Sequence, residues 1–164
     1  MERNLIVAKG TRDQLDVMEA YGNPWRGDDG LAWGLAGRLR AAGLPPGTTL
    51  RVCRQLTPEL AAEIRGARRV IFVDAACRGR PGDLLRQPLE GPAPPLGGGH
   101  HLTPPQLLGL AAALGAGRPP AVLLSMVGQR FPHRPGLSPA VRRNLSRLAD
   151  AVRRELAPPR RRKT

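Results

Sequence analysis

The chain has 164 residues, with 26 lysines and arginines against 13 aspartates and glutamates, and a formal net charge of +13. This length corresponds to one domain of about 150 residues, large enough to bury a core without disulfides or a structural metal. The two cysteines, Cys53 and Cys77, have no CxxC spacing, so the composition excludes a disulfide framework and a zinc ribbon.

The positive charge is almost entirely arginine, since Lys9 and Lys163 are the only lysines. The chain is also rich in glycine and proline and has 3% aromatic residues. We interpret most of the excess as compositional bias on solvated faces, with an anionic partner as the alternative. Residues 158–164, which include three arginines and a lysine, are expected to form a basic, disordered tail.

The first ten residues contain only four consecutive apolar residues, 5–8, which is too short for the core of a signal peptide. No stretch approaches the roughly 18 apolar residues of a membrane span. We therefore expect a soluble, cytoplasmic protein without a membrane partner. Residues 1–14 are an N-terminal segment of unclear role, and the domain is expected over residues 15–157.

Short apolar runs alternate with helical patterns from residue 15 onward, which indicates an α/β domain. A strand is expected at residues 17–21, then a helix in which leucines recur at 31, 35 and 39, then a strand at 50–53. Thr57 is expected to cap a helix that runs from Pro58 to Arg65. The continuous β-branched run at 70–73 predicts a strand buried on both faces that ends at Asp74.

Residues 91–99 are rich in glycine and proline and are expected to form a flexible connector. Thr103-Pro104 then predicts a helix over residues 105–114, and residues 121–127 predict a further buried strand. Ser138-Pro139 opens a last helix, with apolar residues on one face.

Three polar features lie where they would reach the carboxyl ends of the strands, the edge at which open α/β sheets bind ligands. They are Asp28-Asp29 after the first strand, Asp74 after the third, and His100-His101 before the third helix. Two carboxylates and an imidazole would form a mixed oxygen and nitrogen site for a divalent transition metal.

Each feature has an alternative interpretation. Asp28 or Asp29 is suited to capping the first helix, Asp74 to accepting hydrogen bonds from loop amides, and the histidines to an exposed position without function. Cys77, near Asp74, is a further candidate as a thiol nucleophile, although a buried structural cysteine is the commoner outcome. The sequence has no HExxH, GxSxG or P-loop motif.

Taken in order, five segments resemble the nickel-iron hydrogenase maturation proteases, which are endopeptidases specific for the hydrogenase large subunit. The segments are residues 21–30 (YGNPWRGDDG), 55–60 (QLTPEL), 70–75 (VIFVDA) with Pro81-Gly82, 100–104 (HHLTP) and 136–141 (GLSPAV). The resemblance implies a single domain with a twisted, mostly parallel five-stranded sheet between helices.

The resemblance also implies a nickel-recognition site formed by Asp29, Asp74 and His101, with His100 as the adjacent candidate. The implied activity is removal of the C-terminal extension from the nickel-loaded precursor of the large subunit, which is the expected partner. Nickel would come with this substrate, so the resting protein, expected to be a monomer, should be largely metal-free. Asp28 is the nearest spare carboxylate for a general base.

Ala20 and Ala32 stand where the family usually has glycine, and Glu19 interrupts the first strand. These departures motivate an alternative function as a non-catalytic homologue that binds the precursor as an assembly factor. A nucleic-acid-binding domain is a third hypothesis, but the chain lacks the interleaved aromatic residues that stack on bases, so we expect no nucleic-acid partner.

Overall fold

The computed structural model describes residues 6–7, 15–96 and 101–157, in which strands and helices alternate. In chain order the elements are β1 (Ile6–Val7), β2 (Asp16–Tyr21), the 3-10 turn η2 (Gly27–Gly30), α1 (Leu31–Ala42), β3 (Thr48–Cys53), α2 (Leu60–Ile64), β4 (Arg69–Ala76), β5 (Leu84–Pro88), α3 (Pro104–Ala111), the π turn η3 (Ala112–Ala116), β6 (Ala121–Val127) and α4 (Pro139–Leu156).

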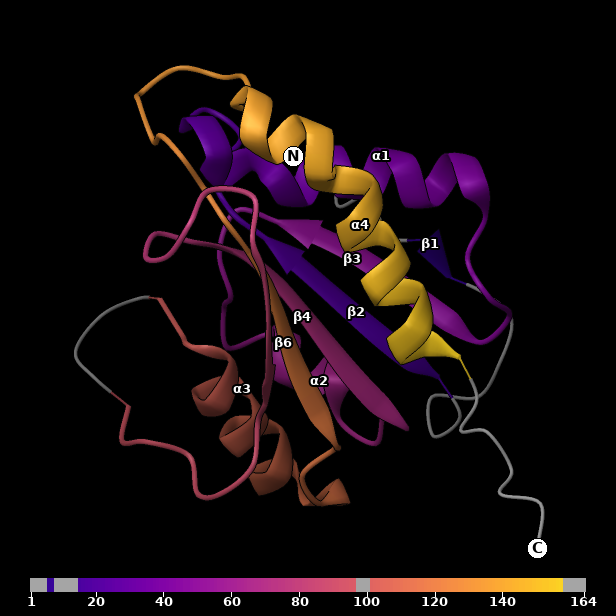
Figure 1. Ribbon diagram of the computed structural model, residues 1–164. Helices are drawn as coiled ribbons and strands as arrows, with labels where there is room; N and C mark the ends of the chain where they lie inside the picture. The colour runs from indigo at the N-terminus through magenta and orange to yellow at the C-terminus, as the bar shows by residue number, and fades with distance from the viewer. Residues whose placement is uncertain (1–5, 8–14, 97–100, 158–164) are drawn as a thin grey trace, which may run out of the picture.

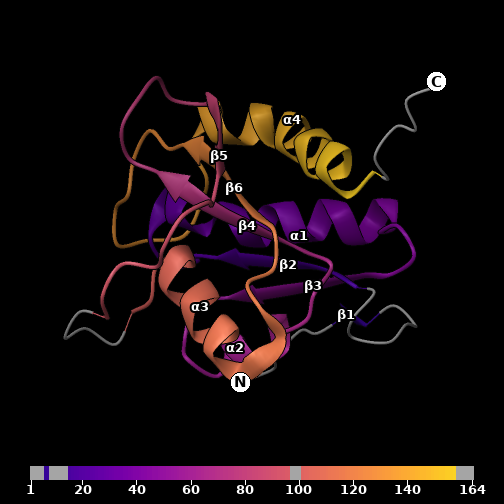
Figure 2. The same ribbon diagram turned by 90° about the horizontal axis from the view of Figure 1, so that it is seen from below.

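One sheet, in the order β1-β3-β2-β4-β6-β5, forms the middle layer. The four central strands pair in parallel, whereas β5 and the two-residue β1 pair antiparallel at the edges. Helices α1 and α4 cover one face, and α2 and α3 cover the other (Figures 1 and 2). The expected α/β domain, with a mostly parallel sheet of five main strands between helices, is confirmed.

Each face of the sheet packs against its helices through a separate hydrophobic cluster. One cluster joins α1 and α4 to residues such as Met18 and Ile71, and the other joins α2 and α3 to residues such as Val70 and Phe72. Residues 70–73 are fully buried, as expected of a central parallel strand. Ala20 and Ala32 are also fully buried in the first cluster, so their methyl groups are part of the packed core.

Three expectations about the elements are wrong in detail. The second helix begins at Leu60 and not at Pro58, because Leu60 and Ala61 form i→i+3 hydrogen bonds to the Thr57 and Pro58 carbonyls and make residues 57–59 a turn. Strand β4 continues past Asp74 to Ala76 because β6 pairs with it up to Val127. Strand β5 was not expected, since its largely exposed residues carry no apolar run.

Helix α3 follows the Thr103-Pro104 pair as expected, with both halves of a capping box formed between Thr103 and Gln106. It begins at Pro104 and ends at Ala111, short of the expected residue 114, because the π turn η3 follows. Helix α4 begins after Ser138, whose hydroxyl accepts a hydrogen bond from the Val141 amide. The described residues exclude four segments: 1–5, 8–14, 97–100 and the tail at 158–164. The third of these contains most of the glycine run before α3 and His100. Within the described residues, no helix is long and apolar enough to cross a membrane.

Buried charges lie at two places in the sheet. At the amino end of β2, Asp16 pairs with Arg68 and Arg69, which compensates its buried carboxylate. In the middle of β2, Glu19 is fully buried, 3.8 Å from Arg51 on the neighbouring strand, and neither carboxyl oxygen has a hydrogen-bond partner. Burial raises the pKa of Glu19 to about 8, although the Arg51 charge opposes the rise.

Candidate functional site

Asp28 is a structural carboxylate that joins two loops. It is fully buried in η2, and its Oδ2 accepts hydrogen bonds from the Gln129 and Arg130 amides at 2.7 and 3.1 Å. Its Oδ1 accepts one from the Ser138 amide at 2.6 Å. We call this arrangement the Asp28 clasp. Because both oxygens accept hydrogen bonds, Asp28 is not the spare carboxylate that the sequence suggested.

The Asp28 clasp also accounts for the charge state of this side chain. Burial by itself would raise the pKa of Asp28, but the backbone hydrogen bonds from Ser138, Gln129 and Arg130 outweigh burial and hold it below its usual range. The ionised carboxylate therefore fastens the β6–α4 loop to the turn after β2.

Asp29 is held at the end of β2 by the same turn. Its Oδ2 accepts a hydrogen bond from the Asn23 amide at 2.9 Å. Gly22 allows the turn to close this tightly, because a Cβ at residue 22 would lie 2.0 Å from the Asp29 carbonyl oxygen. Trp33 in α1 donates from its indole nitrogen to the Gly22 carbonyl at 3.0 Å. The backbone around Asp29 is thus fixed on both sides.

Asp74 lies near the carboxyl end of β4 and is mostly buried. Its Oδ1 accepts a hydrogen bond from the Ala75 amide at 2.7 Å, and the Tyr21 hydroxyl donates a second hydrogen bond to the carboxylate. Burial raises the pKa of Asp74 to about 6; these two hydrogen bonds lower it, and the negative charge of Asp29 raises it again.

Asp29 and Asp74 therefore lie close enough for their charges to repel each other, at the carboxyl ends of adjacent strands. Neither carboxylate forms an ion pair in the described part of the chain. A buried carboxyl next to a second, uncompensated carboxylate is the kind of arrangement found at binding sites for cations and at catalytic sites.

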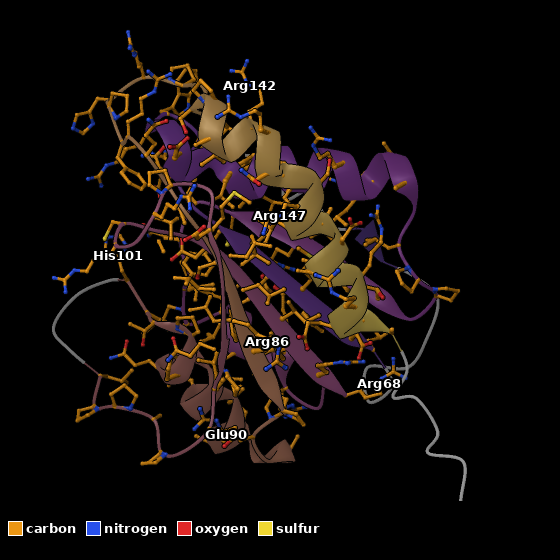
Figure 3. The ribbon with its side chains drawn as sticks, viewed as in Figure 1. Arg68, Arg86, Glu90, His101, Arg142 and Arg147 are labelled. Carbon is orange, nitrogen blue, oxygen red and sulfur yellow. The ribbon has the colours of Figure 1, made fainter. Side chains whose placement is uncertain are left out.

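The histidine of the predicted site is less well defined. His101 is exposed and lies just before α3, at the outer edge of the molecule in Figure 3. Over the described residues, no three His, Cys, Asp or Glu side chains are placed to hold a metal ion together. The structure thus brings Asp29 and Asp74 together without a third protein ligand, and His100 lies outside the described residues.

Tyr21 belongs to this site, although the sequence analysis did not identify it. Burial raises the pKa of Tyr21, and the nearby carboxylates of Asp74 and Asp29 raise it further, so the phenol stays protonated and serves as a donor. Its position follows from the parallel register, which pairs Ala20 with Val73 and thus brings the next two residues, Tyr21 and Asp74, side by side. No sequence signal gives such a register in advance.

The cysteines differ from expectation in one respect. Cys77 is exposed in the loop after β4, so its interpretation as a buried structural cysteine is wrong. Cys53 is partly buried at the end of β3, where burial and the nearby Glu19 raise the pKa of its thiol to about 12. Cys53 is therefore not an activated nucleophile.

The raised pKa of Asp74 predicts a pH-dependent stability difference. The folded chain holds this proton up to pH about 6, whereas the unfolded chain releases it near pH 3.9. The contribution of Asp74 to the free energy of unfolding is thus greatest below pH about 4 and falls as pH rises to about 6. We expect Asp74→Asn to gain about 1–2 kcal/mol relative to the original chain over this range.

Urea denaturation of both proteins at pH 4, 5, 6 and 7.5 measures this difference. A constant difference between them at all four pH values would contradict the assigned pKa. Asp150→Asn, which changes an exposed carboxyl on α4, is the matched control and should show no such trend.

Solved structures of hydrogenase maturation proteases have a similar fold. A hydrogenase maturation protease from Thermococcus kodakarensis KOD1 has a TM-score of 0.67 and 21% identity over 87% of this chain and 92% of its own. The hydrogenase maturating endopeptidase of E. coli has a TM-score of 0.65 and 16% identity, covering 87% and 91%.

A hydrogenase 2 maturation peptidase from a Thaumarchaeota archaeon is similar too, with a TM-score of 0.64 and 20% identity over 87% and 98% of the two chains. No protein-family model matches the sequence, and no curated protein sequence matches it. At these identities the likeness establishes that the chain has the fold of these endopeptidases.

Proposed function

We propose that the protein is an endopeptidase that removes the C-terminal extension from the nickel-loaded large-subunit precursor of a nickel-iron hydrogenase, acting as a monomer in the cytoplasm. The observation that carries the proposal is the pair Asp29 and Asp74, two adjacent carboxylates without a compensating cation in the described residues. The fold shared with solved maturation endopeptidases and the five matching segments support it.

In this proposal Asp29 and Asp74 approach the nickel that the precursor already carries, together with His101 or His100. Asp74 loses its remaining proton when the cation arrives, because a metal ligand must be deprotonated. Tyr21 fixes the orientation of Asp74 through its hydrogen bond. The scissile peptide bond is then held beside a metal that can polarise its carbonyl group or lower the pKa of a bound water.

A second candidate function is binding of the precursor without cleavage, as an assembly factor. The favouring observation is the exposed His101, which leaves the carboxylate pair without a third ligand in the described residues. Ala20 and Ala32 do not favour this alternative, since both are accommodated in the core.

The test is incubation of the purified chain with a nickel-loaded large-subunit precursor, with mass spectrometry of the products. Release of a C-terminal peptide supports the protease, and a stable complex with an intact precursor supports the assembly factor. The precursor without nickel is the control and should stay intact. Cleavage of both forms at the same rate would contradict recognition of nickel.

We expect the purified protein to contain well under one equivalent of metal. Two carboxylates of which one is partly protonated near pH 6, with no thiolate, form a weak site until the substrate supplies the metal and its other ligands. Elemental analysis after purification without chelator measures this content. Stoichiometric zinc whose removal unfolds the chain would contradict nickel recognition in the substrate.

A further inference from the structure

Two segments of the chain concentrate exposed arginines. Residues 77–83 and 128–149 contain seven arginines and a single carboxylate, Asp83. All seven arginines are exposed, and none forms an ion pair in the described part of the chain. We call this region the basic surface; it comprises Arg78, Arg80, Arg130, Arg134, Arg142, Arg143 and Arg147.

Some arginines outside the basic surface are paired with carboxylates. Arg68 binds Asp16, and Arg86 binds Glu155 near the end of α4, both with two hydrogen bonds. Figure 3 shows this separation, with Arg142 and Arg147 over the first half of α4 and Arg68 and Arg86 toward the other end.

The basic surface is continuous because its segments contact one another. Gly82 in the loop after β4 lies against α4, where an added Cβ would be 2.7 Å from the side-chain nitrogen Nδ2 of Asn144. Arg38 on α1 donates to the Ser146 hydroxyl of α4 at 3.0 Å. The loop from β6 to α4, drawn in orange in Figure 1, carries Arg130 and Arg134 and leads directly into α4.

The Asp28 clasp places this surface beside the carboxylate pair. Asp28 binds the amides of Gln129, Arg130 and Ser138, and the next residue along the chain is Asp29. The Gly27 amide also donates to the Arg134 carbonyl at 2.9 Å. These hydrogen bonds hold the backbone of the loop that carries Arg130 and Arg134 against the turn that contains Asp29.

One exposed aromatic residue borders the same place. Trp25 is 64% exposed in the turn between Asn23 and Gly27, next to the exposed Arg26. Tryptophan and arginine are the residues most enriched among those that dominate protein–protein binding energy. Within the described residues Trp25 is the only largely exposed aromatic side chain, whereas single-stranded nucleic acid is bound by several stacking aromatics.

We infer that the basic surface and Trp25 dock an acidic face of the protein substrate while its metal centre lies against Asp29 and Asp74. This inference rests on the proposed function, because it names the chemistry of the partner at the same site. Charges around the rim of an interface act mainly on the association rate and its salt dependence, whereas a buried aromatic anchor acts mainly on dissociation. The two parts of the surface therefore predict two different kinetic effects.

The experiment measures binding of the full chain to an immobilised nickel-loaded precursor, with association and dissociation rates recorded between 0.05 and about 0.3 M salt. The charge-reversal variant is Arg143→Glu with Arg147→Glu on the basic surface. The matched control is Arg65→Glu with Arg154→Glu, which changes the net charge equally at exposed positions outside this surface. Thermal unfolding verifies that each variant is folded.

We expect association of the original chain to slow as salt increases. The charge-reversal variant should associate at least about tenfold more slowly at low salt, and the control should stay within about twofold. Trp25→Ala should dissociate about 30-fold faster with little change in association. Equal association rates for the charge-reversal variant and the control, or unchanged dissociation of Trp25→Ala, would overturn the inference.

Three further outcomes separate this inference from the proposed function. If salt does not change the rate at which the original chain binds or cleaves the precursor, the inference of an acidic partner face is overturned and the proposed function stands. Tighter binding to a 20-nucleotide single strand or to vesicles rich in phosphatidylserine than to the precursor would overturn the protein partner. Absence of both binding and cleavage would overturn the proposed function, and the partner with it.

Discussion

Replacement of Asp28 with alanine is expected to lower the free energy of unfolding by about 3–5 kcal/mol. The change leaves three backbone amides without their acceptor, one buried and two partly buried, and an unsatisfied buried group costs about 1–3 kcal/mol. Losses of this size are a large part of the total stability of a domain. Urea denaturation at pH 7 measures the effect.

Asp28→Asn should lose less than the alanine variant, because an amide retains one carbonyl acceptor but presents its NH2 group to an amide donor. Asp150→Ala, on the exposed side of α4, is the matched control and should change stability by less than about 0.5 kcal/mol. If Asp28→Ala unfolds at the same urea concentration as this control, the Asp28 clasp does not hold the two loops together.

Replacement of Asp74 with asparagine is expected to lower the rate of precursor cleavage by at least about a thousandfold, and Asp29→Asn by a similar factor. Both changes remove a negative charge that the proposal directs at the nickel, and loss of such a charge from a metal-recognition site affects the transition state directly. The fold should survive Asp74→Asn, because burial and the charge of Asp29 both disfavour the ionised form of Asp74, and asparagine carries no charge.

The measurement is single-turnover cleavage of the nickel-loaded precursor, followed by mass spectrometry. Tyr21→Phe is the informative companion, because it removes the hydroxyl that binds Asp74 and keeps the ring. We expect an intermediate loss of about tenfold with a pH profile displaced upward, since the hydroxyl lowers the pKa of Asp74. Full activity of Asp74→Asn would overturn the proposed role of the carboxylate pair.

The sequence predicted the layers of the fold because its strongest signals are local. The buried run at residues 70–73, the Ser138-Pro139 start of α4 and the Thr103-Pro104 start of α3 each depend on neighbouring residues, and all three are present. Strand β5 was missed because an exposed edge strand has no hydrophobic pattern to read.

The site was predicted only in part, for a related reason. Asp29 and Asp74 were identified by their places after strands, but the separate roles of Asp28 and Asp29 depend on which loop returns to meet them. Tyr21 depends on the register between β2 and β4, which is set by the packing of both faces of the sheet. The hydrogen bond from Gln129 to Asp28 joins residues 101 positions apart in the chain, and local sequence patterns do not indicate such a contact.

The chemistry of the Asp28 clasp has a consequence for the variation that this protein tolerates. Three backbone amides donate to the carboxylate, in addition to the Ser138 side chain, and every residue except proline has such an amide. The exposed side chains at positions 129 and 130 can therefore be exchanged freely while the loop keeps its path. A lineage can thus acquire a new recognition sequence in this loop without passing through an unstable intermediate, and proline at position 129, 130 or 138 is the change that selection would remove.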